Sequence, residues 1–163
     1  MRIGIDIGGV IISEDTDNPG LFFSNDYLIA KEVSDSFLSI KNMIQNESSN
    51  NVFIISKCWP DVQNKSKNWL HNKDFFNITG FEYNNIRFCL ERREKRNHCI
   101  ELGIEYFIDD RYSVHRHLQD LPLIKKLFLL NPGESELQLL QKGKKDKIVI
   151  AKNWKEIMGE LYL

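Results

Sequence analysis

Short, uninterrupted apolar runs separated by amphipathic stretches constrain the fold of this chain more than any other feature. Each run is too short for a helix and is rich in β-branched or aromatic residues. The runs cover residues 3–5 (resuming at 10–12), 52–55, 106–108, 127–130 and 148–150. Continuous apolar runs of this length are typical of strands that are buried on both faces of a sheet.

The segments between these runs favour helices. The expected helices cover about 26–45, a segment that starts at Pro60, 95–102, about 111–119 and about 153–162. Proline suits the first turn of a helix, and Gly103 is a typical C-terminal cap. Strands that alternate with helices predict an α/β fold, in which a three-layer, Rossmann-like, mainly parallel sheet carries helices on both faces.

Length and composition predict one domain over residues 1–163. The chain has 42% hydrophobic and 28% charged residues and a formal net charge of −1. A near-zero charge argues against a protein that wraps nucleic acid over its whole surface, and no apolar run reaches the roughly 20 residues of a membrane span. We expect a soluble, cytoplasmic protein with no membrane partner. Three cysteines without CxxC spacing, Cys58, Cys89 and Cys99, are expected to be small buried hydrophobes.

Polar residues follow the first two strands at the points where they end. Asp6 precedes Gly8 and Gly9, and Ser56 and Lys57 follow the second strand. In parallel sheets, ligands bind beyond the carboxyl ends of the strands. Glycine lets the backbone approach a ligand, and a serine hydroxyl can donate to a phosphoryl oxygen. A solvated Asp in a tight turn and a Ser that caps a helix are the simpler alternatives.

Two adjacent carboxylates, Asp109 and Asp110, follow the strand at 106–108. Carboxylate oxygens are ligands for Mg²⁺, although acids also suit the start of a helix. Lys95 precedes Asp109 by fourteen residues. It is placed either to reach the strand ends and neutralise a phosphoryl group, or on the surface within the basic run 87–96. That run is a modest basic patch, which only weakly supports binding to nucleic acid.

The tryptophans and the histidines are expected to have structural rather than catalytic roles. The tryptophans Trp59, Trp69 and Trp154 are expected to fill gaps between the helices and the sheet. All four histidines are assigned to the structure or the surface, because His115 and His117 would point to different faces of a helix.

The segment from Ile3 to Val10 resembles two families. It looks like the first phosphate-binding segment of the sugar kinase and actin-like ATPase family, which has Asp-x-Gly-Gly after a strand. That family needs two domains, for which 163 residues are few, and no second Asp-x-Gly loop follows. A small-molecule kinase-like module is the alternative that this first resemblance leaves open.

The segment also resembles the first motif of the haloacid dehalogenase-like (HAD) phosphatase superfamily, a strand followed by Asp-x-Asp-Gly-Val or -Thr. The later HAD motifs are matched in order by Ser56 after the second strand, by Lys95 ahead of a helix, and by Asp109-Asp110 after a strand. The stretch 101–111 is similar to this region in small HAD nucleotidases.

The HAD resemblance implies a mechanism. Asp6 would attack a phosphoryl group and form an aspartyl-phosphate. Mg²⁺ would lie between Asp6, Asp109 or Asp110, water and the backbone carbonyl of Gly8. Ser56 and Lys95 would act as catalytic residues on the phosphoryl oxygens, and Gly8, Gly9, Ser56, Lys57 and Lys95 would bind the substrate.

The second acid of the first HAD motif is missing, because Gly8 stands where HAD phosphatases carry the Asp that protonates the leaving group. General acid–base catalysis is typically worth about 10²–10⁴ in rate. Three explanations remain open. A loop acid (Glu14, Asp15 or Asp17) replaces it, the leaving group needs no acid, or the protein binds a phosphorylated partner without turnover.

Little cap is expected, because only a loop and one helix lie between the first two strands. An open site favours a macromolecular or extended substrate, or a partner protein. The leading interpretation is thus a Mg²⁺-dependent phosphate-ester hydrolase, phosphatase- or nucleotidase-like, that acts on a phosphorylated small molecule or macromolecule. The alternative is a catalytically weak or inactive HAD-like module that binds a phosphorylated ligand or a partner protein.

Overall fold

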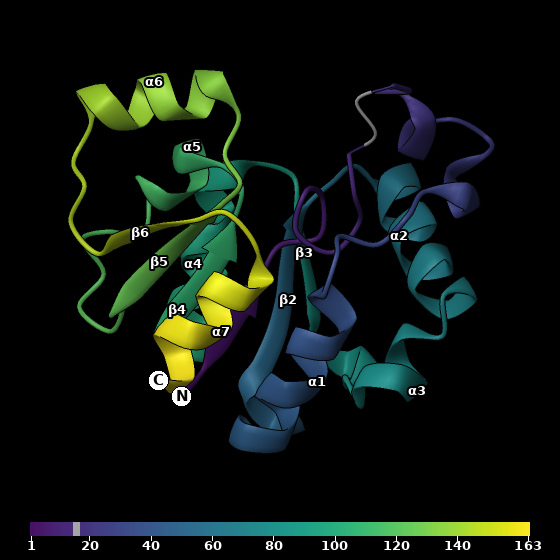
Figure 1. Ribbon diagram of the computed structural model, residues 1–163, viewed down its shortest axis with the longest axis horizontal. Helices are drawn as coiled ribbons and strands as arrows, with labels where there is room; N and C mark the ends of the chain where they lie inside the picture. The colour runs from purple at the N-terminus through teal and green to yellow at the C-terminus, as the bar shows by residue number, and fades with distance from the viewer. Residues whose placement is uncertain (15–16) are drawn as a thin grey trace.

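A single twisted sheet with helices on both faces forms the centre of the molecule, as the computed structural model shows (Figure 1). The structure describes residues 1–14 and 17–163. The six strands are β1 (Ile3–Ile5), β2 (Val52–Lys57), β3 (Ile86–Cys89), β4 (Tyr106–Asp109), β5 (Lys126–Leu130) and β6 (Ile148–Ala151). They lie in the order β3-β2-β1-β4-β5-β6, and every pair is parallel. The α/β, Rossmann-like architecture predicted from the sequence is confirmed.

The helices complete the outer layers. The α-helices are α1 (Ser36–Glu47), α2 (Pro60–Asn72), α3 (Phe75–Thr79), α4 (Lys95–Leu102), α5 (Tyr112–His115), α6 (Glu134–Lys142) and α7 (Trp154–Tyr162). Five short 3₁₀ helices are η1 (Leu21–Phe23), η2 (Tyr27–Ile29), η3 (Ser49–Asn51), η4 (Tyr83–Asn85) and η5 (Arg92–Glu94). Helices α1 and α7 cover one face of the sheet, and α4 and α5 cover the other (Figure 1).

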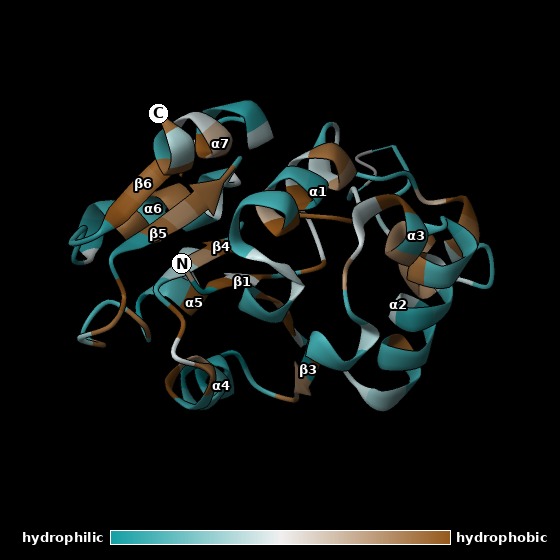
Figure 2. Cartoon of the chain, turned by 90° about the horizontal axis from the view of Figure 1, so that it is seen from below, coloured by the Kyte–Doolittle hydropathy of each residue, from teal (hydrophilic) through white to brown (hydrophobic). Residues whose placement is uncertain are grey.

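Strand β2 shows why its sequence is apolar without interruption. Successive side chains of a strand point to opposite faces. Val52 and Ile54 pack in the cluster that includes α1 and α7, whereas Phe53 and Ile55 pack in the cluster that includes α4 and α5. All four side chains are therefore buried, as the sequence pattern predicts. Figure 2 shows that hydrophobic residues also predominate along β5 and β6, whereas hydrophilic residues cover much of α2.

The helix expected over 26–45 is shorter than predicted, because α1 begins only at Ser36. Residues before it pair with the loop after β1. The Val33 amide donates to the Ile11 carbonyl, and the Ser13 amide donates to the Lys31 carbonyl. These hydrogen bonds hold residues 31–33 extended, so Leu28 and Ile29 lie in the separate 3₁₀ helix η2 and do not extend α1.

Strand β3, together with helices α3 and α6, was not predicted. Its four residues place Arg87 between Ile86 and Phe88, so they form no continuous apolar run, and β3 lies at the edge of the sheet. The basic run expected at 87–96 thus divides into an edge strand, the helix η5 and the first turn of α4.

Within the described parts of the chain, no helix combines the length and the apolar character that crossing a bilayer requires.

Candidate active site

Asp6 and Asp109 lie side by side at the carboxyl ends of the two central strands. The register pairs Ile5 of β1 with Ile108 of β4, and the Asp6 amide donates to the Ile108 carbonyl at 3.0 Å. From β1 the chain first builds the sheet toward β3 and then returns to add β4 on the other side. The two carboxylates therefore lie at the topological switch point, where open α/β sheets place their ligands.

Lys95 joins these two carboxylates. Its Nζ lies 2.9 Å from Asp6 Oδ1 and 2.7 Å from Asp109 Oδ2. The side chain of Lys95 is only 2% exposed and that of Asp109 is fully buried. Lys95 is the first residue of α4, and a capping box formed by Glu91 and Glu94 fixes the turn that precedes it. The lysine therefore lies at the strand ends, as the first of the two sequence interpretations predicts.

Asp110 adds a third carboxylate, and Gly9 makes room for it. Asp6, Asp109 and Asp110 each offer an oxygen within 4.8 Å of the others. Gly9 has a φ of +71°, and a Cβ built there would lie 2.4 Å from Asp110 Oδ2. Any other residue would be strained at this φ and would push against Asp110. Gly9 is thus required for the shape of the carboxylate cluster.

The electrostatics of this cluster show an excess of negative charge. Burial alone would lower the pKa of Lys95, but Asp109 and Asp6 raise it above its usual value. Burial raises the pKa of Asp6 against the opposing effect of Lys95. Burial, followed by the charges of Asp109 and Asp6, raises the pKa of Asp110 to about 8. The Lys95 ammonium group contacts two of the three carboxylates, and a further cation at this position would compensate the remaining negative charge.

Ser56 lies at the end of β2, on the other side of β1 from Asp109. Its side chain is buried, and the Cys58 Sγ lies 4.0 Å from its Oγ. Lys57 is exposed, with its Nζ 6.0 Å from the centre of the Trp59 ring. Burial raises the pKa values of the Cys58 and Cys89 thiols to about 11. All three cysteines are buried and free, as expected.

Gly8 leaves open space beside the cluster. A Cβ built at Gly8 meets no atom within 4 Å, and its φ is not in the left-handed region. Of the loop acids proposed to replace the missing acid, Glu14 connects to the cluster through Arg111, whose guanidinium is 3.5 Å from Glu14 and 3.8 Å from Asp110. Asp17 is exposed, and Asp15 lies outside the described residues.

A cavity of about 460 Å³, which was not predicted from the sequence, adjoins the site. Gly8, Ser56 and Arg111 line its inner side, and Phe22, Phe23 and Trp59 supply aromatic walls. The expectation that Trp59 fills a gap between helix and sheet is wrong, because Trp59 is 57% exposed. It is the residue before α2, where the chain leaves the sheet edge, so its ring faces the cavity rather than the core. Trp69 and Trp154 are fully buried, as expected.

His115 is the histidine nearest to the cluster in the fold, and it has a structural environment. It is fully buried at the end of α5, and its Nε2 lies 2.9 Å from the Phe128 carbonyl oxygen. Burial lowers the pKa of His115 to about 4, so the ring is neutral at physiological pH and Nε2 donates to that carbonyl.

Comparison with known proteins decides the type of fold. The sequence matches no protein-family model and no curated protein. Its structure is similar to that of D,D-heptose 1,7-bisphosphate phosphatase from B. bronchiseptica, solved with magnesium and phosphate. The TM-score is 0.68 at 12% identity, and the match covers 99% of this chain and 98% of that chain. The fold is HAD-like.

Two further solved structures are similar, one to the fold of the phosphatase and one to its Rossmann-like architecture. D,D-heptose 1,7-bisphosphate phosphatase from Burkholderia thailandensis has a TM-score of 0.61 at 10% identity, with 98% of this chain and 97% of that chain covered. A de novo designed Rossmann 3x3 protein has a TM-score of 0.51 at 10% identity, with 100% and 96% covered. The HAD-like fold with a minimal cap, which the motifs implied, is therefore confirmed.

Proposed function

We propose that this chain is a Mg²⁺-dependent phosphate-ester hydrolase that acts through an aspartyl-phosphate on Asp6. One observation carries the proposal. Lys95 holds Asp6 and Asp109 together in a buried cluster at the switch point of a HAD-like fold. Two solved proteins with this fold are phosphatases by name, and one of them was solved with magnesium and phosphate.

The donor set fits Mg²⁺. Three carboxylates converge within 4.8 Å, and hard divalent cations of this size prefer such oxygen ligands. Burial, followed by the charges of Asp109 and Asp6, raises the pKa of Asp110, so a cation beside it would favour the ionised carboxylate. We assign Asp6, Asp109, Asp110 and the backbone carbonyl of Gly8 as the residues that would hold Mg²⁺. When bound, the ion would neutralise charge on the phosphoryl oxygens.

The residues of the chain have distinct roles in the proposed reaction. A carboxylate oxygen of Asp6 attacks phosphorus, the phosphorus–oxygen bond of the ester breaks, and the leaving group departs as the alcohol after taking up a proton from water. Water then attacks the aspartyl-phosphate, which releases inorganic phosphate and regenerates the Asp6 carboxylate. Lys95 orients Asp6 and opposes the rise in its pKa that burial causes, and Ser56, Lys57 and the backbone at Gly8 and Gly9 bind phosphoryl oxygens.

Metal binding and turnover provide the direct test. We expect Mg²⁺ to raise the melting temperature of the protein, because a ligand at 100 times its Kd adds about 2.7 kcal/mol to stability. We also expect Mg²⁺ to be required for the release of phosphate from at least one ester of a broad panel. Asp110→Asn should reduce the thermal shift. If Mg²⁺ causes no thermal shift and no ester of the panel releases phosphate, the proposal is refuted.

Gly8 favours a second candidate function, in which the HAD-like site binds a phosphorylated ligand or partner protein with little or no turnover. Among the residues that the structure describes, none places a carboxyl group within 4 Å of a Cβ built at Gly8, where it could protonate a leaving group. Binding of Mg²⁺ and of a phosphate analogue such as beryllofluoride, without phosphate release, would support this candidate over the hydrolase.

Replacing Gly8 by aspartate distinguishes the two functions. The side chain meets no atom within 4 Å at its Cβ, so the variant should fold. We expect Gly8→Asp to raise the kcat for alkyl phosphates by up to about 10²–10⁴-fold, the usual contribution of general acid–base catalysis. Gly8→Asn has the same shape without the acid and should give no such gain. An unchanged kcat in a Gly8→Asp protein that still binds Mg²⁺ would show that the missing acid does not limit the reaction.

A further inference from the structure

The cavity beside the carboxylate cluster indicates which kind of substrate the site binds, provided that the proposed function holds. Gly8 and Ser56, which adjoin the proposed phosphoryl position, also line this cavity. Its volume of about 460 Å³ is far larger than a phosphoryl group requires. It falls in the range of roughly 300–1,000 Å³ that is usual for small-molecule sites. The part of the substrate that enters it is therefore the leaving group.

The outer walls of the cavity are aromatic and exposed. Phe23 is 67% exposed and Trp59 is 57% exposed, and both line the cavity from different elements, η1 and the N-terminal cap of α2. Large aromatic side chains that gather at a concave surface without a partner commonly mark a binding site. Aromatic rings present π-faces on which another flat ring can stack.

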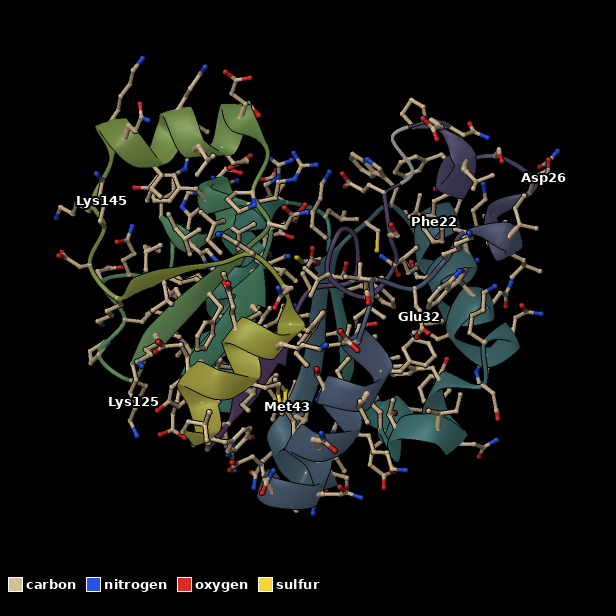
Figure 3. The ribbon with its side chains drawn as sticks, in the orientation of Figure 1. Phe22, Asp26, Glu32, Met43, Lys125 and Lys145 are labelled. Atoms are coloured by element: carbon tan, nitrogen blue, oxygen red, sulfur yellow. The ribbon has the colours of Figure 1, made fainter. Side chains whose placement is uncertain are left out.

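These walls are held in place before any ligand arrives. Lys65 of α2 donates to the Phe23 and Ser24 carbonyls at 2.7 and 3.1 Å. The Phe22 ring packs edge-on against Tyr27, with centroids 6.1 Å apart. In Figure 3, Phe22 lies on the side of this segment that faces the sheet, whereas Asp26 lies at the outer edge. A wall that is already ordered binds a rigid ligand group at a lower entropic cost than a mobile wall does.

The cavity also has polar lining residues, and Ser56, Lys57 and Arg111 are among them. Lys57 lies over the Trp59 ring, and Arg111 pairs with Glu14 at 3.5 Å. A leaving group made only of hydroxyl-bearing carbons would place those hydroxyls against Phe22, Phe23 and Trp59, where they lose hydrogen bonds to water. A planar ring would instead stack on the same walls, and stacking on protein aromatics is favourable for any nucleobase.

We propose that the cavity binds the leaving group of the phosphate ester and that this group carries a planar aromatic ring. Two sources share this chemistry. The ring is a nucleobase, one sugar away from the phosphate, or it is bonded directly to the ester oxygen, as in an aryl phosphate. A phenolate leaves without a proton donor, so the aryl ester would also suit a site with Gly8 in place of the acid.

Binding of non-hydrolysable analogues tests the proposal on the unmodified protein. The probes are phosphonate analogues of adenosine monophosphate, phosphotyrosine and ribose 5-phosphate, in which a carbon–phosphorus bond replaces the ester bond. With Mg²⁺ present, calorimetry should show that at least one ring-bearing analogue binds on the order of tenfold more tightly than the ribose analogue. Of the three tryptophans only Trp59 is exposed, so the ring-bearing analogues should also quench its fluorescence.

Trp59→Ala should reduce the preference for the ring-bearing analogue to about twofold or less. Leu123→Ala is a matched control, because Leu123 is also 57% exposed and does not line the cavity, and it should keep the full preference. Equal affinities for all three analogues, or a preference that survives Trp59→Ala, would overturn the proposal. If none of the three binds and Mg²⁺ does not bind, the proposed function itself fails.

Discussion

Asp6→Asn is expected to lower phosphate release by on the order of 10⁴-fold or more, as the loss of a nucleophile does in other enzymes. The amide cannot form the aspartyl-phosphate, and Asp6 is the one carboxylate that both contacts Lys95 and ends the central strand β1. The measurement is steady-state phosphate release with saturating Mg²⁺, together with a search for the phosphoryl-enzyme by mass spectrometry in the parent protein.

The same substitution should leave the fold intact. Burial raises the pKa of Asp6, so its ionised form destabilises the folded state at neutral pH, and a neutral amide removes that cost. The melting temperature without Mg²⁺ should therefore stay equal or rise. Asp26→Asn makes the same chemical change at an exposed position away from the cavity and should keep the parent rate. Phosphate release by Asp6→Asn at a similar rate would exclude Asp6 as the nucleophile.

Lys95→Met should cause the largest loss of stability of any single change at the site. It leaves Asp6 and Asp109 buried without a cation, and removing one partner of a buried ion pair typically costs about 3–5 kcal/mol. Because Mg²⁺ would then be the main source of positive charge, it should stabilise Lys95→Met more than it stabilises the parent. Urea unfolding with and without Mg²⁺ measures both effects.

Lys126→Met is the matched control for this change. Lys126 also pairs with a carboxylate, Glu160, at 2.9 Å, but both side chains are substantially exposed. Such surface pairs contribute about 1 kcal/mol or less. If Lys95→Met loses no more stability than Lys126→Met, the lysine does not compensate the carboxylates in the way that the contacts indicate.

The carboxyl ends of the strands could be predicted from the sequence because burial imposes a strong pattern there. A strand that is covered on both faces is apolar along most of its length, so Asp6, Ser56 and Asp109 stand out as the first polar residues at the carboxyl ends of β1, β2 and β4. Parallel pairing then brings those positions to one edge of the sheet. Lys95 was harder to place, because within a basic run nothing in the sequence separates a buried lysine from a solvated one.

The features that sequence reasoning missed depend on tertiary contacts. Strand β3 interrupts its apolar residues with Arg87, which an edge strand tolerates and a central one does not. Trp59 is a large aromatic residue of the kind that usually fills a core. Only the direction in which the chain leaves β2 turns its ring toward the cavity. The contact of Arg111 with Glu14 joins residues 97 positions apart and leaves no local signal.

The attachment of residues 21–30 to α2 has a consequence for the kinetics of ligand exchange. Lys65 and Trp69 of α2 donate to the carbonyls of Phe23, Ser24 and Ala30, so this segment moves with the helix as one body. In enzymes whose sites close under a hinged lid, opening of the lid often limits the release of product. With this wall tied to α2, we expect the residence time of a ligand to be set by the contacts that it makes inside the cavity. Dissociation rates should accordingly follow affinity from one ligand to the next.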